Sequence, residues 1–290
     1  MILFWTSRNP KNLRANPELD FSTVEQFHKY AQVQKFINNL KRLIVAFSGG
    51  IDSTLVLKVA YDVLGQNVLA VTADSPSVPR KELGEASRLA KLIGARHLVI
   101  ETGEMQNHNY LQNPVNRCYF CKSELYSKLA EIARREKFQF IANGTNFDDL
   151  GDYRPGLQAA EEFQVVSPLK EAQLTKAEVR LLAKKLNLEI WNKPSSPCLS
   201  SRIPYGSAVT ARKLAMIEKA EDFLKGFHIK DLRVRHFGAR ARIEVPKKEL
   251  VFIEKNFHKI SAKFKTIGFD KIDLAEFKSG SLNAGLNLNV

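Results

Sequence analysis

The sequence of 290 residues predicts an α/β protein, a doubly wound parallel sheet with a smaller C-terminal α+β domain. Up to about residue 190, short apolar runs alternate with segments of helical periodicity, as in chains that build a parallel sheet with crossover helices. The apolar runs are continuous, which is typical of strands buried on both faces. After a proline-rich stretch the pattern changes to alternating strands, which indicates an antiparallel element.

The elements of the first part follow one another in regular order. A helix over 23–40 comes first, with apolar side chains near one face. The predicted strands are 42–47, 67–73, 96–101 and 138–143. The helices between them are 52–64, 80–94 and a third near 121–137. Right-handed crossovers of this kind leave helices on both faces of the sheet.

The rest of the chain carries more varied signals. "VVSPL" at 165–169 predicts a fifth strand, and 174–188 an amphipathic helix in which Thr175 and Glu178 form a capping box. Prolines and serines in 189–209 indicate a loop. The elements expected after it are a helix near 210–225, two strands meeting near Gly238, a helix near 247–265 and a strand at 271–277. The expected units are an N-terminal extension and helix (1–40), an α/β domain (41–190), a hinge loop with Cys198 (191–209) and an α+β domain (210–290).

Composition bears on where the protein is located and on which partners it could bind. No apolar run approaches the ~20 residues of a membrane span. The apolar start "MILFW" is too short for a signal-peptide core, so we expect a cytoplasmic protein. Three cysteines, an odd number, argue against a disulfide framework. The net charge of +13 fits either many solvated lysines or an anionic partner, which would be RNA or a phosphorylated small molecule.

A phosphate-binding turn is predicted where the first strand meets the next helix. The residues of this turn are Ser48, Gly49, Gly50, Asp52, Ser53 and Thr54. Glycines let the backbone approach an anion, and free N–H groups at a helix start attract negative charge. A Walker A loop would need a Gly-Lys-Ser/Thr sequence, and a dinucleotide fingerprint would need a third glycine. Neither is present, so we do not expect γ-phosphoryl transfer.

The three cysteines suggest a shared centre, whose nature the spacing leaves open. Cys118 and Cys121 stand in "NRCYFCK", and Cys198 stands in "PSSPCLSSR". The CxxC spacing brings two thiolates to one metal centre. Four interpretations are compatible with it: a zinc site with a fourth ligand, a redox pair, ordinary buried cysteines, and an iron–sulfur cluster held by three thiolates.

Two further polar groups are candidate ligands. In "RVRHFGARARIEV", Arg233 and Arg235 share one strand face, and a hairpin can bring them near the polar face of the next strand. That second face contains Arg240, Arg242 and Glu244. Arginine binds phosphate through two donors, although a solvated sheet face is the simpler interpretation. The acidic group Asp148, Asp149 and Asp152 either caps a turn or faces a metal-bound nucleotide.

Several motifs resemble known families. "SGGIDS" is similar to the signature of the PP-loop ATP pyrophosphatases, whose fold is of the adenine-nucleotide α-hydrolase type. Between about residue 40 and about residue 283 stand the motifs "SGGIDST", "TADSPSVPRKEL", "NPVNRCYFCK", "NGTNFDDLGDYRPG", "SPLKEAQLTKAEVR", "WNKPSSPCLSSRIPYG", "RVRHFGARARIEV" and "FKSGSLN". Through these motifs the chain resembles the LarE family of ATP-dependent sulfur transferases, which act in nickel-pincer nucleotide biosynthesis for lactate racemase.

The resemblance implies the site residues. The nucleotide would be held by Ser48, Gly49, Gly50, Asp52, Ser53, Thr72, Asp74, Gly144 and Asp149. Arg233 and Arg235 would bind the phosphate of the substrate, with Arg202 as a further candidate, and Glu244 would contact metal or substrate. The catalytic residues would be Cys118, Cys121 and Cys198, which in the three-cysteine form of the family hold a [4Fe-4S] cluster.

The implied reaction uses ATP, Mg²⁺ and this cluster. A carboxylate of pyridinium-3,5-biscarboxylic acid mononucleotide is adenylated with release of pyrophosphate. Sulfur carried as an extra sulfide on the cluster's open iron then replaces an oxygen, and AMP leaves. The expected partner is a sulfide or persulfide donor, with no membrane or nucleic acid, and a homo-oligomer is left open.

Other functions remain as alternatives. One is a cluster-dependent tRNA thiolase, which the charge of +13 would suit. Another is sacrifice of the Cys198 sulfur, as in the one-cysteine form of the family. An amide-forming PP-loop ligase would leave the cysteines without a role. The last is a non-catalytic carrier of nucleotide and cluster, which the intact "SGGIDS" disfavours.

Overall fold

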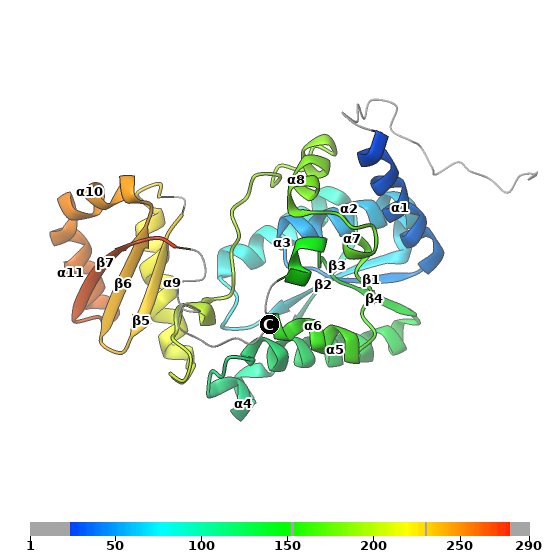
Figure 1. Ribbon diagram of the computed structural model, residues 1–290. Coiled ribbons are helices and arrows are strands. Elements are labelled where there is room, and N and C mark those ends of the chain that lie inside the picture. The colour runs from blue at the N-terminus through cyan, green and yellow to red at the C-terminus, as the bar shows by residue number, and fades with distance from the viewer. Residues whose placement is uncertain (1–23, 152–153, 230, 279–290) are drawn as a thin grey trace, which may run out of the picture.

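The computed structural model describes residues 24–151, 154–229 and 231–278, which form two sheets with their helices (Figure 1). The first sheet has four parallel strands in the order β3-β2-β1-β4. The strands are β1 (Leu43–Ala46), β2 (Val68–Asp74), β3 (Arg96–Glu101) and β4 (Phe140–Ala142). The predicted doubly wound parallel sheet is confirmed, and the strand order reverses between β1 and β4, where such sheets bind ligands.

Helices cover both faces of this sheet. They are α1 (Val24–Leu40), α2 (Ile51–Leu64), α3 (Arg80–Ile93), α4 (His108–Leu111), α5 (Arg117–Glu136), α6 (Pro155–Glu162), α7 (Pro168–Glu171) and α8 (Lys176–Lys185). Alternate side chains of β1 enter different cores. Leu43 and Val45 pack with α1, α2, α3 and α8, whereas Ile44 packs with α5 and α6. Burial on both faces explains the uninterrupted apolar runs of the sequence.

One expectation about these elements is wrong, and one helix is confirmed with an earlier start. Residues 165–169 form no strand: Val166 makes an isolated parallel bridge to Ala142, and Pro168 then begins α7. Proline suits the first turn of a helix because its φ is fixed and its missing N–H would have no partner there. The helix expected near 121–137 begins earlier, at Arg117, so both cysteines of the CxxC motif lie in the first turns of α5.

The predicted capping box of α8 is confirmed. The Thr175 hydroxyl accepts the backbone N–H of Glu178 at 3.3 Å, and the Glu178 carboxylate accepts the backbone N–H of Thr175 at 2.8 Å. The same carboxylate binds Lys29 of α1 at 2.8 Å. The start of α8 is therefore fixed against α1, close to the phosphate loop.

The C-terminal part contains a three-stranded mixed sheet. Its strands are β5 (Arg233–Phe237), β6 (Arg240–Val245) and β7 (Lys271–Glu276), and its helices are α9 (Ala211–Lys225), α10 (Lys247–Lys255) and α11 (Phe257–Ile267). β5 and β6 are antiparallel, and β6 and β7 are parallel. The single helix expected over 247–265 is wrong. Asn256 separates two helices, because asparagine favours helix ends over helix interiors.

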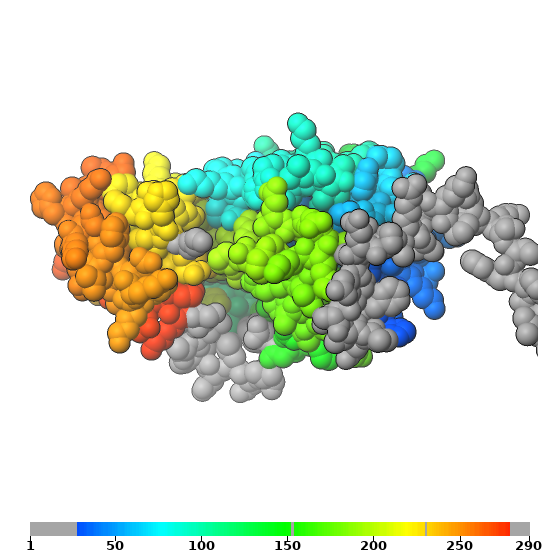
Figure 2. Space-filling view, turned by 90° about the horizontal axis from the view of Figure 1, so that it is seen from above, coloured from blue at the N-terminus to red at the C-terminus, as the bar shows by residue number. Residues whose placement is uncertain are grey.

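Residues 191–209 join the two parts, which lie side by side along the molecule (Figure 2). This segment has a small core of its own, formed by Leu199, Ile203 and Val209 together with Tyr110 of α4 and Leu214 of α9. It is therefore packed against both parts. No described helix is long and apolar enough to cross a membrane.

Candidate active site

The phosphate loop folds tightly on itself between β1 and α2. Gly49 has a φ of +68°, and a Cβ there would lie 3.0 Å from Ala86 of α3. The Ser48 and Ser53 hydroxyls lie 3.1 Å apart, and the Ser53 hydroxyl donates to the Gly50 carbonyl at 3.1 Å. Only glycine fits the left-handed position against α3 without strain. These contacts fix the path of the loop between β1 and α2.

The first turn of α2 presents backbone N–H groups at this loop. Gly50 is the N-cap residue, and no side chain caps the turn. The first N–H groups of a helix have no partner within the helix, and the helix dipole adds positive potential there. An anion is the natural ligand for such a turn. The geometry thus agrees with the predicted phosphate site.

The loop after β4 packs directly on the phosphate loop. Gly144 lies so close that a Cβ on it would be 2.6 Å from the Ser53 nitrogen. The Asn146 side chain donates to Asp52 at 3.1 Å, and Lys176 of α8 forms an ion pair with the same carboxylate. β4, α2 and α8 thereby hold the predicted nucleotide edge together.

The acidic residues of this loop have structural partners. Asp148 accepts the backbone N–H of Lys176 at 2.8 Å, and Asp149 accepts that of Asn146 at 3.0 Å. Asp149 also pairs with Arg154 at 2.8 Å, and burial raises its pKa above the ordinary value. The structure therefore gives both carboxylates the capping role that the sequence left open. Asp152 lies outside the described residues.

The edge that follows β2 is also internally bonded. Thr72 is buried and donates its hydroxyl to the Phe47 carbonyl at 2.7 Å. Since that proton is used, the contact of 2.8 Å between Thr72 Oγ1 and His97 Nε2 has the histidine as donor. Asp74 forms an ion pair with Arg80 at the start of α3. Thr72 therefore holds the backbone of Phe47, the residue before Ser48, and supports the phosphate loop indirectly.

The segments that contain the three cysteines lie at the same end of the first sheet. Cys118 and Cys121 lie one turn apart on α5, and Cys121 packs against the core that contains Leu199. The backbone N–H of Leu199, next to Cys198, donates to the Ser77 carbonyl at 2.8 Å. Ser77 follows β2, so this bond fixes the Cys198 segment beside the predicted nucleotide edge.

The thiols influence one another electrostatically. Burial raises the pKa of Cys121 to about 12, and the charges of Glu104 and Cys198 contribute further. Loss of hydration, followed by the charge of Cys198, also raises the pKa of Cys118, whereas Arg117 and Lys122 act in the opposite direction. The charges of Cys198 and Lys122 thus act on both thiols of α5.

The arginines expected to bind phosphate are engaged within the protein. Arg202 is 1 % exposed, and each of its three side-chain nitrogens donates to a partner. Arg235 pairs with Glu244 at 2.9 Å and donates to the Ser201 carbonyl at 2.7 Å. Glu244, the weak metal candidate, is therefore already bonded to a cation.

Arg233 differs from the other two arginines. It donates to two backbone carbonyls, those of Ser195 and Leu232, each at 2.7 Å. Its side chain is half-buried and lies 5.4 Å from the ring of Phe277. Because carbonyls are weaker partners than carboxylates, Arg233 is the one of the three that a phosphate could recruit most readily.

Sequence reasoning missed several residues of this region. Lys193 binds Glu82 of α3 at 2.7 Å and reaches the Gly49 carbonyl at 3.5 Å, so it ties the Cys198 segment to the phosphate loop. Glu104 is 2 % exposed; its Oε1 accepts from Ser77 at 3.3 Å, and its Oε2 has no partner among the described residues. Asn113 and Lys176 were also missed. Their partners lie far away in sequence, which no local pattern reveals.

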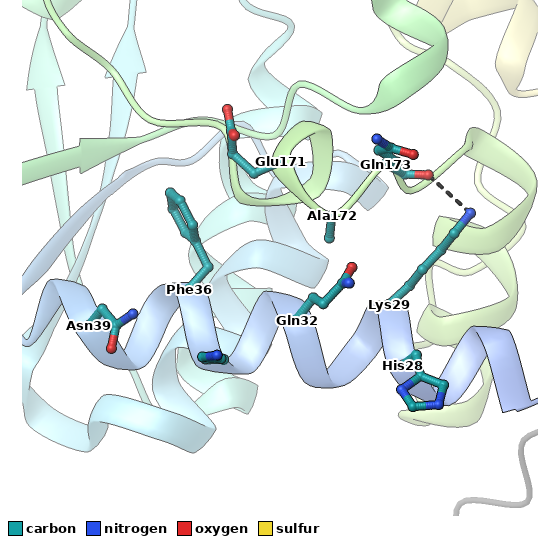
Figure 3. A pocket seen from close by; sticks show the side chains of 9 residues that line it. His28, Lys29, Gln32, Phe36, Asn39, Glu171, Ala172 and Gln173 are labelled. Carbon is teal, nitrogen blue, oxygen red and sulfur yellow. Dashed lines mark hydrogen bonds between the residues drawn. The ribbon is translucent and has the colours of Figure 1, made fainter.

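A separate pocket of about 550 Å³ lies between α1 and α7 (Figure 3). Lys29 borders it and donates to the Gln173 carbonyl at 3.2 Å. The other lining residues include Gln32, Phe36 and Glu171. None of its lining residues belongs to the phosphate loop or to a cysteine segment, so it is no part of the candidate active site.

Comparison with known proteins agrees with this architecture. The NAD synthase family model matches residues 23–119, the part that contains the phosphate loop. The glutamine-hydrolyzing GMP synthase of Aeropyrum pernix is 25 % identical over 203 residues, which are 63 % of this chain and 39 % of that enzyme. The family match includes β1, β2 and β3 together with the phosphate loop, which agrees with a PP-loop domain.

Several relatives match most of the chain. One is an uncharacterised protein from Synechocystis, 45 % identical, with 88 % of this chain covering 97 % of that protein. Another is the pyridinium-3,5-bisthiocarboxylic acid mononucleotide synthase of Lactiplantibacillus plantarum. It is 37 % identical over 262 residues, which are 88 % of this chain and 94 % of that enzyme. The chain therefore belongs to the LarE family of PP-loop sulfurtransferase enzymes.

Proposed function

We propose that the protein is an ATP-dependent sulfurtransferase that acts on pyridinium-3,5-biscarboxylic acid mononucleotide. It adenylates one carboxylate and replaces an oxygen of that group by sulfur, for nickel-pincer nucleotide biosynthesis. The name of the Lactiplantibacillus relative supports this substrate. The observation that carries the proposal is the bond from the Leu199 N–H to the Ser77 carbonyl, because it holds the Cys198 segment beside the predicted nucleotide edge.

Adenylation explains why one site would combine a phosphate loop with thiols. A carboxylate oxygen leaves poorly as oxide, whereas an acyl adenylate loses AMP readily. The uncapped N–H groups of α2 and the Ser48 hydroxyl would stabilise the pyrophosphate that departs from ATP. Mg²⁺ would supply charge neutralisation at the phosphates. The activated acyl group must then meet sulfur without leaving the site.

We assign the three thiols to a [4Fe-4S] cluster because the chain has all three cysteines of the family's cluster form. The described residues contain no group of three His, Cys, Asp or Glu side chains placed to hold a metal ion, so the assignment rests on the sequence motifs. Cys118, Cys121 and Cys198 would hold the cluster, which supplies an iron without a protein ligand where an extra sulfide can bind. Arg117 and Lys122 would offset the negative charge of the thiolates.

The substrate brings a phosphate of its own. We assign it to Arg233, whose present partners are the carbonyls of Leu232 and Ser195. Ser195 stands three residues before Cys198, so a phosphate on Arg233 would lie close to the cysteine segment. Arg235 and Arg202 would act from behind, by holding Ser201 and the Cys198 carbonyl in place.

The test begins with anaerobically prepared protein. We expect a brown chromophore with iron bound, and we expect Ala at Cys118, Cys121 or Cys198 to abolish both. Ser127→Ala, an exposed position on the same helix, is the matched control. Iron content that stays undiminished in all three cysteine variants would contradict the cluster assignment.

The reaction itself is tested with ATP and the pyridinium nucleotide. Pyrophosphate release and a thiocarboxylate product are expected. Thiolation of bulk tRNA in place of the nucleotide would favour the tRNA thiolase, and ATP binding without turnover would favour a carrier. Mass spectrometry of Cys198 after turnover separates the sulfur sources: intact cysteine is expected, whereas dehydroalanine would show that the protein sacrifices its own sulfur.

A further inference from the structure

Asn113 links the helix of the CxxC motif to the segment of Cys198. It lies between α4 and α5, is completely buried and has a φ of +56°. Its side-chain amide donates to the carbonyls of Ile203 at 3.2 Å, Pro204 at 2.7 Å and Ser207 at 3.0 Å. Its backbone carbonyl accepts the N–H of Gly206 at 2.9 Å. One residue therefore bonds to four of the five positions from 203 to 207.

A second set of bonds extends this link toward the thiols. The Asn113 side-chain oxygen accepts from Arg117, which also donates to the Ser200 carbonyl at 3.1 Å. Tyr110 of α4 meets the Ser200 hydroxyl at 2.7 Å. Arg117 precedes Cys118, and Ser200 stands two residues after Cys198. We call the set of Tyr110, Asn113, Arg117 and Ser200 the asparagine clamp.

We propose that Asn113 is a positioning residue that holds Cys198 near Cys118 and Cys121 before any inorganic centre is bound. The inference rests on the proposed function, since it concerns how the three ligands are assembled. Fixing the backbone of one residue costs about 1–2 kcal/mol in entropy, so a loop ordered in advance spares that cost when the cluster forms. The clamp would raise the effective concentration of the third thiol near the other two.

Asparagine is the side chain that suits this position. It tolerates positive φ better than most residues, and its amide offers donors and an acceptor together. Aspartate has nearly the same shape but cannot donate when ionised, and it would set a buried charge against three carbonyl oxygens. Glycine keeps the backbone conformation and removes the side chain. The two substitutions therefore separate the hydrogen bonds from the backbone geometry.

The experiment measures the closeness of thiols in protein without iron. In a Cys121→Ser background, Cys118 and Cys198 are treated with dibromobimane, which fluoresces strongly after it links two thiols. Alkylation of single thiols by iodoacetamide gives the reference rate. We expect Asn113→Gly and Asn113→Asp to lower the ratio of cross-linking to alkylation about tenfold. Gln112→Ala, the exposed neighbour, should leave the ratio unchanged.

The outcome separates this inference from the proposed function. No iron, ATP or substrate is involved, so a lowered ratio supports the clamp even if sulfur transfer is never observed. An unchanged ratio in both Asn113 variants, with a cooperative thermal transition like that of the background protein, overturns the inference. If the Asn113 variants do not fold, Tyr110→Phe removes one hydroxyl of the clamp. A lowered ratio of cross-linking to alkylation in that variant then supports the inference, and an unchanged ratio overturns it.

Discussion

Arg202 and Glu221 form a completely buried ion pair between the Cys198 segment and α9. Arg202 Nε and Nη2 donate to the two carboxylate oxygens at 2.9 and 3.1 Å, and both residues are 1 % exposed. The same guanidinium donates to the Cys198 carbonyl at 3.0 Å, while Glu221 accepts the backbone N–H of Val234 at 3.1 Å. The pair thus joins the cysteine segment to β5.

Breaking this pair should destabilise the protein strongly. Arg202→Met leaves the buried Glu221 carboxylate with only Lys225, at 4.0 Å, as a cation. Removing one partner of a buried pair typically costs about 3–5 kcal/mol. Urea unfolding followed by circular dichroism measures the loss. The double variant Arg202→Met, Glu221→Leu should recover much of it, since no charge then remains buried. A loss below about 1 kcal/mol in the single variant would show that water reaches the pair.

Gly144 and Gly84 provide a matched test of close packing. Gly144→Ala places a methyl group 2.6 Å from the Ser53 nitrogen, so the two loops must separate. We expect a cost of about 1–3 kcal/mol, as for other overpacked sites, together with at least tenfold weaker ATP binding. Gly84→Ala in α3 meets nothing within 4 Å and should gain up to about 1 kcal/mol through helix propensity. Calorimetry with a slowly hydrolysed ATP analogue and urea unfolding report both effects. Equal ATP affinity and equal stability of the two variants would show that Gly144 does not pack closely against Ser53.

Lys176 should contribute to nucleotide affinity through Asp52. Its ammonium group neutralises that carboxylate in the first turn of α2, where the phosphates would approach. Lys176→Met leaves Asp52 to repel them, and we expect about tenfold weaker ATP binding with little change in folding, because the pair is partly exposed. Lys91→Met, an exposed lysine on α3, is the control. Undiminished affinity in the Lys176 variant would remove this residue from the site.

His97 should make stability depend on pH. Burial lowers its pKa in the folded protein, whereas the unfolded chain titrates near 6.5. Unfolding therefore takes up a proton once the pH falls below about 6.5, so stability declines from there down to the folded pKa. His97→Gln keeps a donor for Thr72 and should flatten this decline.

The measurement is urea unfolding at several pH values between 8 and 5. Some pH dependence should remain in His97→Gln, because burial and Lys213 also lower the pKa of His236. His236 is buried in the second sheet and is untouched by the substitution. An identical pH profile for both proteins would show that His97 does not titrate in this range.

The first sheet could be predicted because its signals are local. Uninterrupted apolar runs marked the strands, and the glycine pair marked the turn into α2. The apolar run at 165–169 was misleading. Its apolar side chains indicate that the segment is buried, but they do not indicate a strand, and Pro168 begins a helix there. The break at Asn256 was missed because the helical periodicity continues across it.

The site was only partly predictable, for a related reason. The phosphate loop lies within seven consecutive residues, and the CxxC pair within one helix turn. Asn113 and Tyr110 find their partners 90 positions further along the chain, where no spacing rule connects them. Arg202 looked like a phosphate ligand by its motif, yet its burial and its pairing with Glu221 emerge only from the folded chain.

Cys118 and Cys121 belong to one helix of 20 residues, whereas the Cys198 segment bonds to Ser77, which follows β2, and to Arg235 of β5. Any drift of one sheet relative to the other changes the spacing to Cys198 and leaves the pair on the helix unchanged. Substitutions in β5 can then alter the chemistry at long range without contacting a reactant. Natural variation in the C-terminal sheet would be as informative about this enzyme's turnover as variation in the phosphate loop.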